Sequence, residues 1–402
     1  MLDSNKLTQG SAISCFLNLS ESCGNKLSQY TDIICQKILV CMSVYKSNVL
    51  KQLYDSLGPF AKYLPGFSTN NIFTTQILPI MIYRIAVEKR EFTICDLALI
   101  DSISYLSFFF KERFLPFTEN LICFCVSTIE QGINQIIASE QDPSIDGPDT
   151  DYIAACLDLL ASLVEHVGFP IKQLLIKYNV SNVLGRSCMC SEKDIRISVF
   201  LVIGLVAQLF IDVLQPNIDT FITLLLDFKE SDSVDVISNS FWAIKYFIQK
   251  LGPESSKYIP YFMDHVFLLL SSLQLNKQTL ENLVCNFSYF TKYCPTQMRA
   301  YLPNTVHFWC SCLKGLRDST IKNEVCINLC CLLSEDPATF VNHSNLIFEG
   351  FASFRQVDDS VKSNFSQLMT KLSNQIEQND WQKITSQMSV VLKNKLNILY
   401  GL

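Results

Sequence analysis

Three stretches decide the fold: VDVISNSFWAIKYFIQKLGP at residues 234–253, KQTLENLVCNFSYFTKYCP at 277–295 and STIKNEVCINLCCLLSEDP at 319–337. In each stretch apolar residues recur every three or four positions, which is the spacing of an amphipathic helix, and a proline follows the helix. These prolines, Pro253, Pro295 and Pro337, recur about every 42 residues. A period of this length with two helices per repeat is typical of HEAT and armadillo proteins.

A second proline series, Pro216, Pro260 and Pro303, falls at or near the start of the intervening helices. We therefore expect a first helix of each repeat in segments such as 258–273, 301–313 and 340–354. The same periodicity predicts the second helices of the repeats at 8–22, 47–62, 92–110, 151–168, 194–209, 234–251, 277–293, 319–335 and 358–376.

The repeat predicts an all-α HEAT-repeat α-solenoid, a right-handed superhelical stack of antiparallel helix pairs. One helical hairpin cannot bury its apolar stripe alone, so neighbouring hairpins stack and share a core. We expect a single solenoid over 1–402 with about nine repeats and an acidic loop at 139–151. Met1 falls just before a second helix, as in the back portion of a longer solenoid, whereas the Lys- and Gln-containing end is typical of a closing cap.

Composition excludes several classes of function. A net charge of −6 argues against general nucleic-acid binding, which needs a basic face, and suits basic partners. The N-terminus lacks the basic start and apolar run of a signal peptide. The most apolar stretch, Val199–Ile211, is too short to span a bilayer, so we expect a core helix and no membrane partner.

The sequence offers no site for catalysis, a metal or a cofactor. Its 17 cysteines include no C-x-x-C pair, and buried free thiols in a reducing compartment are the expectation. No Gly-rich phosphate loop, His-Glu metal pair or nucleophile elbow is present. The four histidines are scattered, and we expect none to have an acidic partner at short spacing. A protein-binding function remains.

Several segments, taken in order, resemble the transportin family of importin-β-superfamily nuclear import receptors. They are LDSNK at the start, DYIAACLDLLASL (151–163), FWAI (241–244), KYIP (257–260), KQTLENL (277–283), FWCSCLKGLRD (308–318) and the ending DWQK…LKNKLNILYGL. The resemblance runs in register from residue 2 to 402 with short gaps. It covers the receptor's C-terminal, cargo-binding half or a little less.

The resemblance implies a receptor that shuttles between cytoplasm and nucleus. Its second helices line a concave face that binds extended basic nuclear localisation signals ending in Pro-Tyr. The GTPase Ran, held mostly by the N-terminal half, releases the cargo through a long acidic loop, and Phe-Gly nucleoporins dock between first helices. In this alignment the main Ran site, that loop and the main Pro-Tyr pocket would all lie before Met1.

The resemblance also implies which residues contact cargo. Acidic contacts of the family match Glu21, Asp55, Asp101, Asp158 and Glu165, all on expected second helices. Trp242 matches a concave-face tryptophan, and we expect Phe241 and Ile244 to fill the core in its place. Large, rigid aromatic side chains such as this are frequent binding anchors. Trp309 and Trp381 are interpreted as packing residues on first helices.

Departures from the family pattern predict a weaker or altered cargo preference. A basic residue, Lys62, and an apolar one, Leu205, replace acids; Ser238 replaces an asparagine that holds peptide backbone, while Leu97 and Cys285 replace an aromatic and an aliphatic contact. Two other readings stay open: a HEAT scaffold with no transport role, and a diverged copy that folds but no longer transports. The acids would then be ordinary solvated residues of helix faces.

Overall fold

The computed structural model describes residues 3–88, 93–229, 232–272 and 274–401, and every regular element among them is helical. The chain divides into two compact units, Met1–Leu224 and Leu225–Leu402. The described residues therefore confirm the all-α HEAT-repeat prediction. That the chain forms one continuous solenoid stays a prediction.

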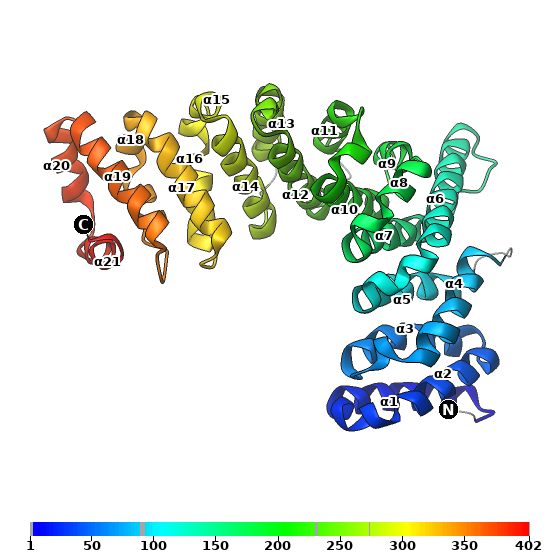
Figure 1. Ribbon diagram of the computed structural model, residues 1–402. Coiled ribbons are helices and arrows are strands. Elements are labelled where there is room, and N and C mark those ends of the chain that lie inside the picture. Colours follow the sequence, from blue (N-terminus) through cyan, green and yellow to red (C-terminus); the bar gives the residue numbers. More distant parts are fainter. Residues whose placement is uncertain (1–2, 89–92, 230–231, 273, 402) are drawn as a thin grey trace. The chain divides into compact units, whose positions relative to one another are not determined.

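The first unit alternates first and second helices. The second helices α1, α3, α5, α7 and α10 pack in that order against one another (Figure 1). The helices are α1 Lys6–Leu27, α2 Thr31–Val44, α3 Ser47–Tyr63, α4 Leu78–Ala86, α5 Ile94–Phe110, α6 Thr118–Gln141, α7 Thr150–Val167, α8 Lys172–Lys177, α9 Val180–Cys188 and α10 Lys193–Phe210; α11 Ile218–Leu226 contains the boundary between the units.

The second unit repeats this arrangement with its own core. Its second helices α12, α14, α17 and α19 contact one another in series (Figure 1). The helices are α12 Val234–Leu251, α13 Ile259–Ser272, α14 Lys277–Tyr293, α15 Pro295–Arg299, α16 Leu302–Gly315, α17 Thr320–Glu335, α18 Pro337–Phe351, α19 Asp359–Gln375, α20 Gln378–Gln387 and α21 Val390–Tyr400.

All nine expected second helices are present, most with ends within two residues of the predicted ones. The largest difference is α1, which runs to Leu27 because the chain continues its helical course through a kink at Cys23. The expected first helices correspond to α13, α16 and α18. The predicted start at Phe92 and the predicted end at Leu273 lie outside the described residues.

The acidic loop is shorter than the predicted 139–151. Helix α6 continues to Gln141 and α7 begins at Thr150, so the loop comprises 142–149. Its carboxylates are held locally: Asp142 accepts hydrogen bonds from the amide and hydroxyl of Ser144, and Asp149 caps α7 by accepting from the amide of Asp151. Short acidic side chains satisfy exposed amides in this way at turns and helix starts.

Helix α7 shows how the apolar pattern positions polar residues. Its buried face carries Ile153, Leu157, Leu160 and Val164. The opposite face exposes Asp151, Asp158 and Glu165, which are seven residues apart and therefore lie in one line along the helix. Burial of the apolar face fixes which way these three acids point.

Two stretches, 94–141 and 193–214, are long and apolar enough to cross a membrane by length and composition alone. The second is longer than Val199–Ile211, the segment that the sequence suggested was too short to span a bilayer. In the second, 67% of the most apolar window is buried within the protein. A helix that packs its apolar residues against neighbours has the properties of a core helix.

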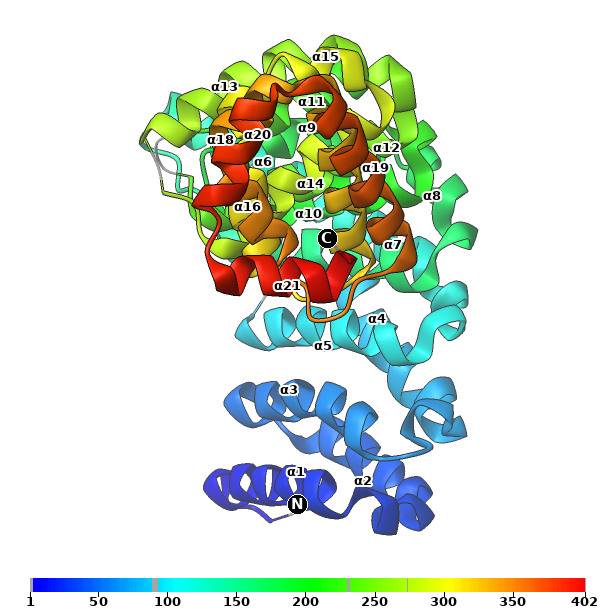
Figure 2. The same ribbon diagram turned by 90° about the vertical axis from the view of Figure 1, so that its left-hand side faces the viewer.

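The C-terminal helix α21 packs against α18 and α19. It runs crosswise to α19 and α20 (Figure 2). Tyr400 anchors it, because its hydroxyl donates to the carbonyl of Phe351 at 2.9 Å and its ring lies 4.4 Å from that of Phe365. The expected polar outer face is only partly realised, since Val390, Val391 and Ile398 are exposed.

Candidate functional site

Three carboxylates lie on one exposed face of three adjacent second helices. Asp55 on α3, Asp101 on α5 and Asp158 on α7 are all exposed, and α5 packs against both α3 and α7. We call these residues the acidic row. The charges of Asp158 and Asp55 both act on Asp101, so each of them lies within electrostatic range of the middle carboxylate. Three of the five predicted acids are thus brought together.

The acidic row carries negative charge that the chain itself only partly compensates. Partial burial, followed by the charges of Asp158 and Asp55, raises the pKa of Asp101. Burial likewise raises the pKa of Asp158, although a hydrogen bond with Ser198 opposes the shift. Of the three acids in the row, only Asp55 has a close basic partner among the described residues, Lys51 at 2.8 Å. A cation bound at Asp101 would relieve this unfavourable charge.

The remaining two predicted acids lie apart from the row. Glu21 on α1 is exposed, and its charge acts on Lys62 of α3. Glu165 is exposed two turns beyond Asp158 and lies 3.7 Å from the ring of its neighbour His166. Leu97, one turn before Asp101, is half-buried. Leu205 on α10 is buried, so no charge replaces the missing acid at that position.

Trp242 of the second unit lies at the surface of α12. Phe241 and Ile244 fill the core instead, as expected, while the indole is half-exposed. Its ring packs edge-on against Tyr246, with centroids 5.0 Å apart. The Lys245 ammonium lies 5.4 Å from the indole and 4.7 Å from the Tyr246 ring. The aromatic surface is therefore available, but a lysine of the same helix already sits over it.

Two expected contact residues are nearly inaccessible. Ser238 and Cys285 are each 8% exposed. The Ser238 hydroxyl accepts a hydrogen bond from the side-chain amide of Asn282 at 3.0 Å, which joins α12 to α14. Burial raises the pKa of Cys285 to about 11, so its thiol stays protonated. We therefore leave both residues out of the proposed binding surface.

Comparison with known proteins supports the resemblance. No protein-family model matches the chain. The chain is 25% identical over 403 residues to transportin-1 of Mus musculus and of Homo sapiens, across 100% of its own length and 45% of theirs. Transportin-1 of Oryza sativa subsp. japonica is 24% identical over 407 residues. The chain is transportin-like. It spans less than half the length of these relatives.

Solved structures support the fold of the transportin-like chain. Kap95p bound to RanGDP superposes with a TM-score of 0.53 at 13% identity, over 92% of this chain and 44% of Kap95p. Importin beta in an ammonium sulfate condition gives 0.53 at 10% identity, over 93% and 46%. An engineered protein gives 0.57 at 10% identity, over 92% and 86%. At such identities the likeness concerns the helical-repeat fold alone.

Sequence reasoning missed the aromatic residues of the transportin-like chain that surround the predicted contacts. Tyr105 and Phe108 are exposed four and seven residues after Asp101 on α5. Tyr289 on α14 is half-buried, and its hydroxyl donates to Glu324 at 3.2 Å. The signal was available for α5, because residues spaced by four and seven share the face of Asp101.

One serine–histidine pair resembles catalytic machinery, contrary to the expectation that no histidine has an acidic neighbour. Ser107 Oγ lies 2.8 Å from His166 Nδ1, and Glu165 flanks the ring. However, the Ser107 side chain is fully buried, so no substrate reaches its hydroxyl. Over the described ranges no group of three or more His, Cys, Asp or Glu residues is arranged to hold a metal.

Replacing Asp101 with asparagine is expected to stabilise the first unit at pH 7, by less than about 1 kcal/mol because the site is solvent-screened. The folded-state pKa of Asp101 is raised, so its ionised form disfavours folding above that pKa, and the cost disappears as the pH falls below the unfolded value near 3.8. Urea unfolding followed by circular dichroism should show the gain at pH 7 and none near pH 3.

The matched control is Asp55→Asn, because Asp55 is paired with Lys51. That change should leave stability unchanged or slightly reduced at pH 7. If both substitutions raised the free energy of unfolding equally, the unfavourable charge could not be assigned to Asp101.

Proposed function

We propose that this chain is a nuclear import receptor or part of one, and that its second helices bind extended basic nuclear localisation signals. The acidic row is the observation that carries the proposal. Three carboxylates stand on consecutive helices, and two of them lack a close basic partner among the described residues. The names of its relatives, transportin-1 and importin subunit beta-2, support the same role.

The spacing of the row suits an extended ligand. Packed helices lie about 8–10 Å apart, and an extended peptide advances about 3.3 Å per residue. A basic residue at about every third position would therefore meet one carboxylate per helix. Each exposed pair contributes only about 0.2–1 kcal/mol, so the row mainly accelerates association and makes binding sensitive to salt.

First helices of the second unit present apolar hollows that suit Phe-Gly nucleoporins. A hollow of about 410 Å³ between residues 226–229 and α13 is lined by Leu226, Leu268 and Leu269. Another of about 520 Å³ between α13 and α16 is lined by Leu270, Leu275 and Phe308. Kap95 has been solved with Nup1 and Kap121p with RanGTP. Docking of nucleoporins in these hollows, and shuttling under Ran control, belong to this proposal.

The test is fluorescence anisotropy with a lysine-rich peptide ending in Pro-Tyr, beside the same peptide with its lysines replaced by glutamine. We expect only the basic peptide to bind, and its affinity to fall as salt shortens the Debye length from about 10 Å at 0.1 M. Asp158→Asn should weaken binding by at most about fivefold. Glu140→Gln, an exposed acid on the first helix α6, should have no effect.

Equal affinity for the basic and glutamine peptides at low salt would overturn the proposal. A HEAT scaffold with no transport role would then be the better description, since the fold is independent of the row. The same conclusion would follow if Asp158→Asn and Glu140→Gln weakened binding equally.

A further inference from the structure

An exposed aromatic patch adjoins the acidic row. Tyr105 is 47% exposed and Phe108 53% exposed, and both belong to α5. Phe109, half-buried, supports them, with its ring centroid 5.6 Å from Tyr105 and 4.9 Å from Phe108. We call Tyr105, Phe108 and Phe109 the aromatic patch. Large apolar side chains exposed together on a folded protein mark a surface that contacts a partner.

The helix geometry places this patch beside Asp101. Tyr105 follows Asp101 by four residues and Phe108 by seven, so all three occupy one face of α5. The side chains of Asp101 and Tyr105 start about 6 Å apart, whereas Phe108 lies about 10 Å along the helix. A single side chain can therefore reach the Asp101 carboxylate and the Tyr105 ring together.

The neighbouring helices hold the patch in place and set its charge. A Cβ atom at Gly58 of α3 would lie 2.2 Å from Cδ1 of Tyr105, so the ring rests where α3 lacks a side chain. Phe108 packs edge-on against His166 of α7 at 5.3 Å. Lys62 of α3 carries a positive charge near Tyr105, and this charge opposes a bound cation on the Lys62 side of the ring.

We propose that the aromatic patch and Asp101 together select arginine over lysine in the bound basic segment. This inference rests on the proposed function, because it names the residue type that the acidic row and the aromatic patch prefer in the proposed basic ligand. A guanidinium group is planar, stacks on aromatic rings and pairs with a carboxylate through two hydrogen bonds. A lysine ammonium is a compact, strongly hydrated charge that gains less from a ring.

Neither a purely apolar nor a purely charged ligand accounts for an acid and exposed rings side by side. A purely apolar ligand would leave the charge of the acidic row uncompensated, and a purely electrostatic one would not need exposed rings. Arginine satisfies both, since its apolar stem and planar head cover the ring while its charge meets Asp101. Charge complementarity therefore favours a basic residue over leucine, and stacking on the rings favours arginine over lysine.

The experiment compares three peptides of one sequence on the full chain, with arginine, lysine or leucine at the basic positions. We expect the arginine peptide to bind about three- to fivefold more tightly than the lysine peptide. Tyr105→Ala and Phe108→Ala should each reduce this ratio, and together bring it to about one, while affinity for the lysine peptide changes little. Tyr83→Ala, an exposed aromatic on the first helix α4, should keep the ratio.

Each outcome is decisive. Equal binding of the arginine and lysine peptides would overturn arginine selection and leave the proposed function standing. If neither basic peptide binds, both fail. A leucine peptide that binds as tightly as the arginine peptide would show an apolar partner site instead. Circular dichroism of each variant verifies that an altered ratio reflects binding and not unfolding.

Discussion

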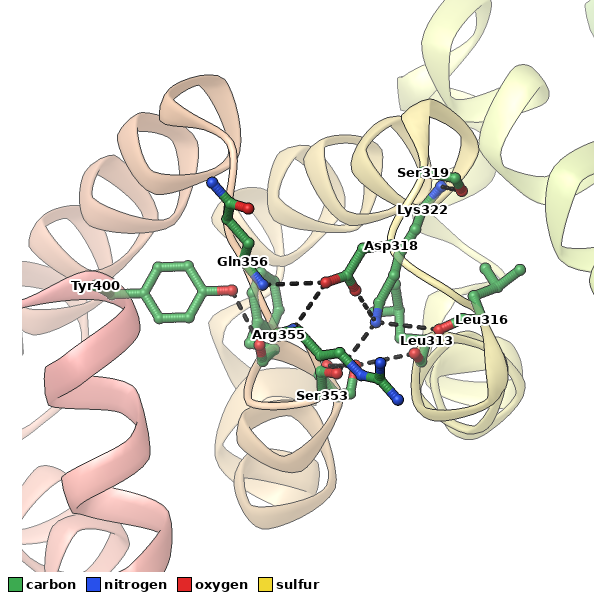
Figure 3. Close-up of polar contacts among 11 residues, drawn as sticks. Leu313, Leu316, Asp318, Ser319, Lys322, Ser353, Arg355, Gln356 and Tyr400 are labelled. Atoms are coloured by element: carbon green, nitrogen blue, oxygen red, sulfur yellow. Dashed lines mark hydrogen bonds and ion pairs between the residues drawn. The ribbon is translucent and has the colours of Figure 1, made fainter.

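Replacing Lys322 with methionine is expected to lower the free energy of unfolding of the second unit by about 3 kcal/mol. The side chain of Lys322 is only 1% exposed. Its ammonium donates to the carboxylate of Asp318 at 3.0 Å and to the carbonyls of Leu316 and Ser353, both at 3.2 Å (Figure 3). The ammonium also lies 4.3 Å from the centre of the Phe354 ring, so its contacts are made inside the protein.

This cluster joins two loops of consecutive repeats. Asp318 precedes α17, and its carboxylate accepts hydrogen bonds from the amides of Arg355 at 2.8 Å and Gln356 at 3.0 Å in the loop before α19 (Figure 3). Partial burial raises the pKa of Asp318, but the hydrogen bonds from Gln356, Lys322 and Arg355 outweigh it, so the net pKa is lowered. The stability from this carboxylate is present above pH 4 and is lost as the pH falls through the lowered pKa.

Methionine has a similar length but donates no hydrogen bond. It would leave the carbonyls of Leu316 and Ser353 without this donor and remove the positive partner of Asp318. A buried polar group that loses its partner keeps the full cost of its removal from water. The loss stays in the lower part of the range for buried ion pairs, because Asp318 retains two amide donors and some contact with solvent.

Tryptophan emission during urea unfolding measures the effect, because Trp242, Trp309 and Trp381 all belong to the second unit. The matched control is Lys277→Met. Lys277 also forms an i,i+4 ion pair, with Glu281 at 3.7 Å, but its side chain is 67% exposed. The control should cost less than about 1 kcal/mol. Equal losses from the two substitutions would show that the cluster contributes no more than a surface pair.

The sequence predicted the helices well because periodicity and proline position are local signals. The nine second helices follow from apolar residues every three or four positions, and each such face must be buried. Lys322 shows the limit. In sequence, Asp318 and Lys322 have the i,i+4 spacing of an ordinary exposed pair. Their burial depends on Ser353 and the residues that follow it, which no local pattern connects to them.

The candidate site was predictable in part for the same reason. The exposure of Asp55, Asp101 and Asp158 was predictable, because an apolar face buried on one side of a helix leaves the other side exposed, whereas their contact with cargo stays a prediction. The burial of Ser238, which replaces the family's backbone-holding asparagine, was not predictable, since its hydrogen bond comes from Asn282, 44 residues later. The position of the Tyr105 ring likewise depends on Gly58, a residue of the preceding second helix.

Replacing Trp242 with alanine is expected to weaken binding of the basic peptide to the chain by about 30-fold, the loss typical of a central aromatic anchor. The indole is half-exposed and packs edge-on against Tyr246, so a ligand can reach part of the ring. Its loss removes the area on which the aliphatic stems of basic side chains pack. Anisotropy titrations with the arginine peptide measure the change.

A substitution at Lys245 tests whether the ligand contacts the Trp242 ring. Its ammonium covers Trp242 and Tyr246, and burial lowers the pKa of Lys245, so the charged form is held there at a cost. A cationic ligand must displace this ammonium from the rings. Lys245→Ala should therefore tighten binding, in the opposite direction to Trp242→Ala, while Tyr261→Ala on the first helix α13 should change nothing. Weaker binding in both α12 variants would mean that α12 supports the fold and that its indole contacts no ligand.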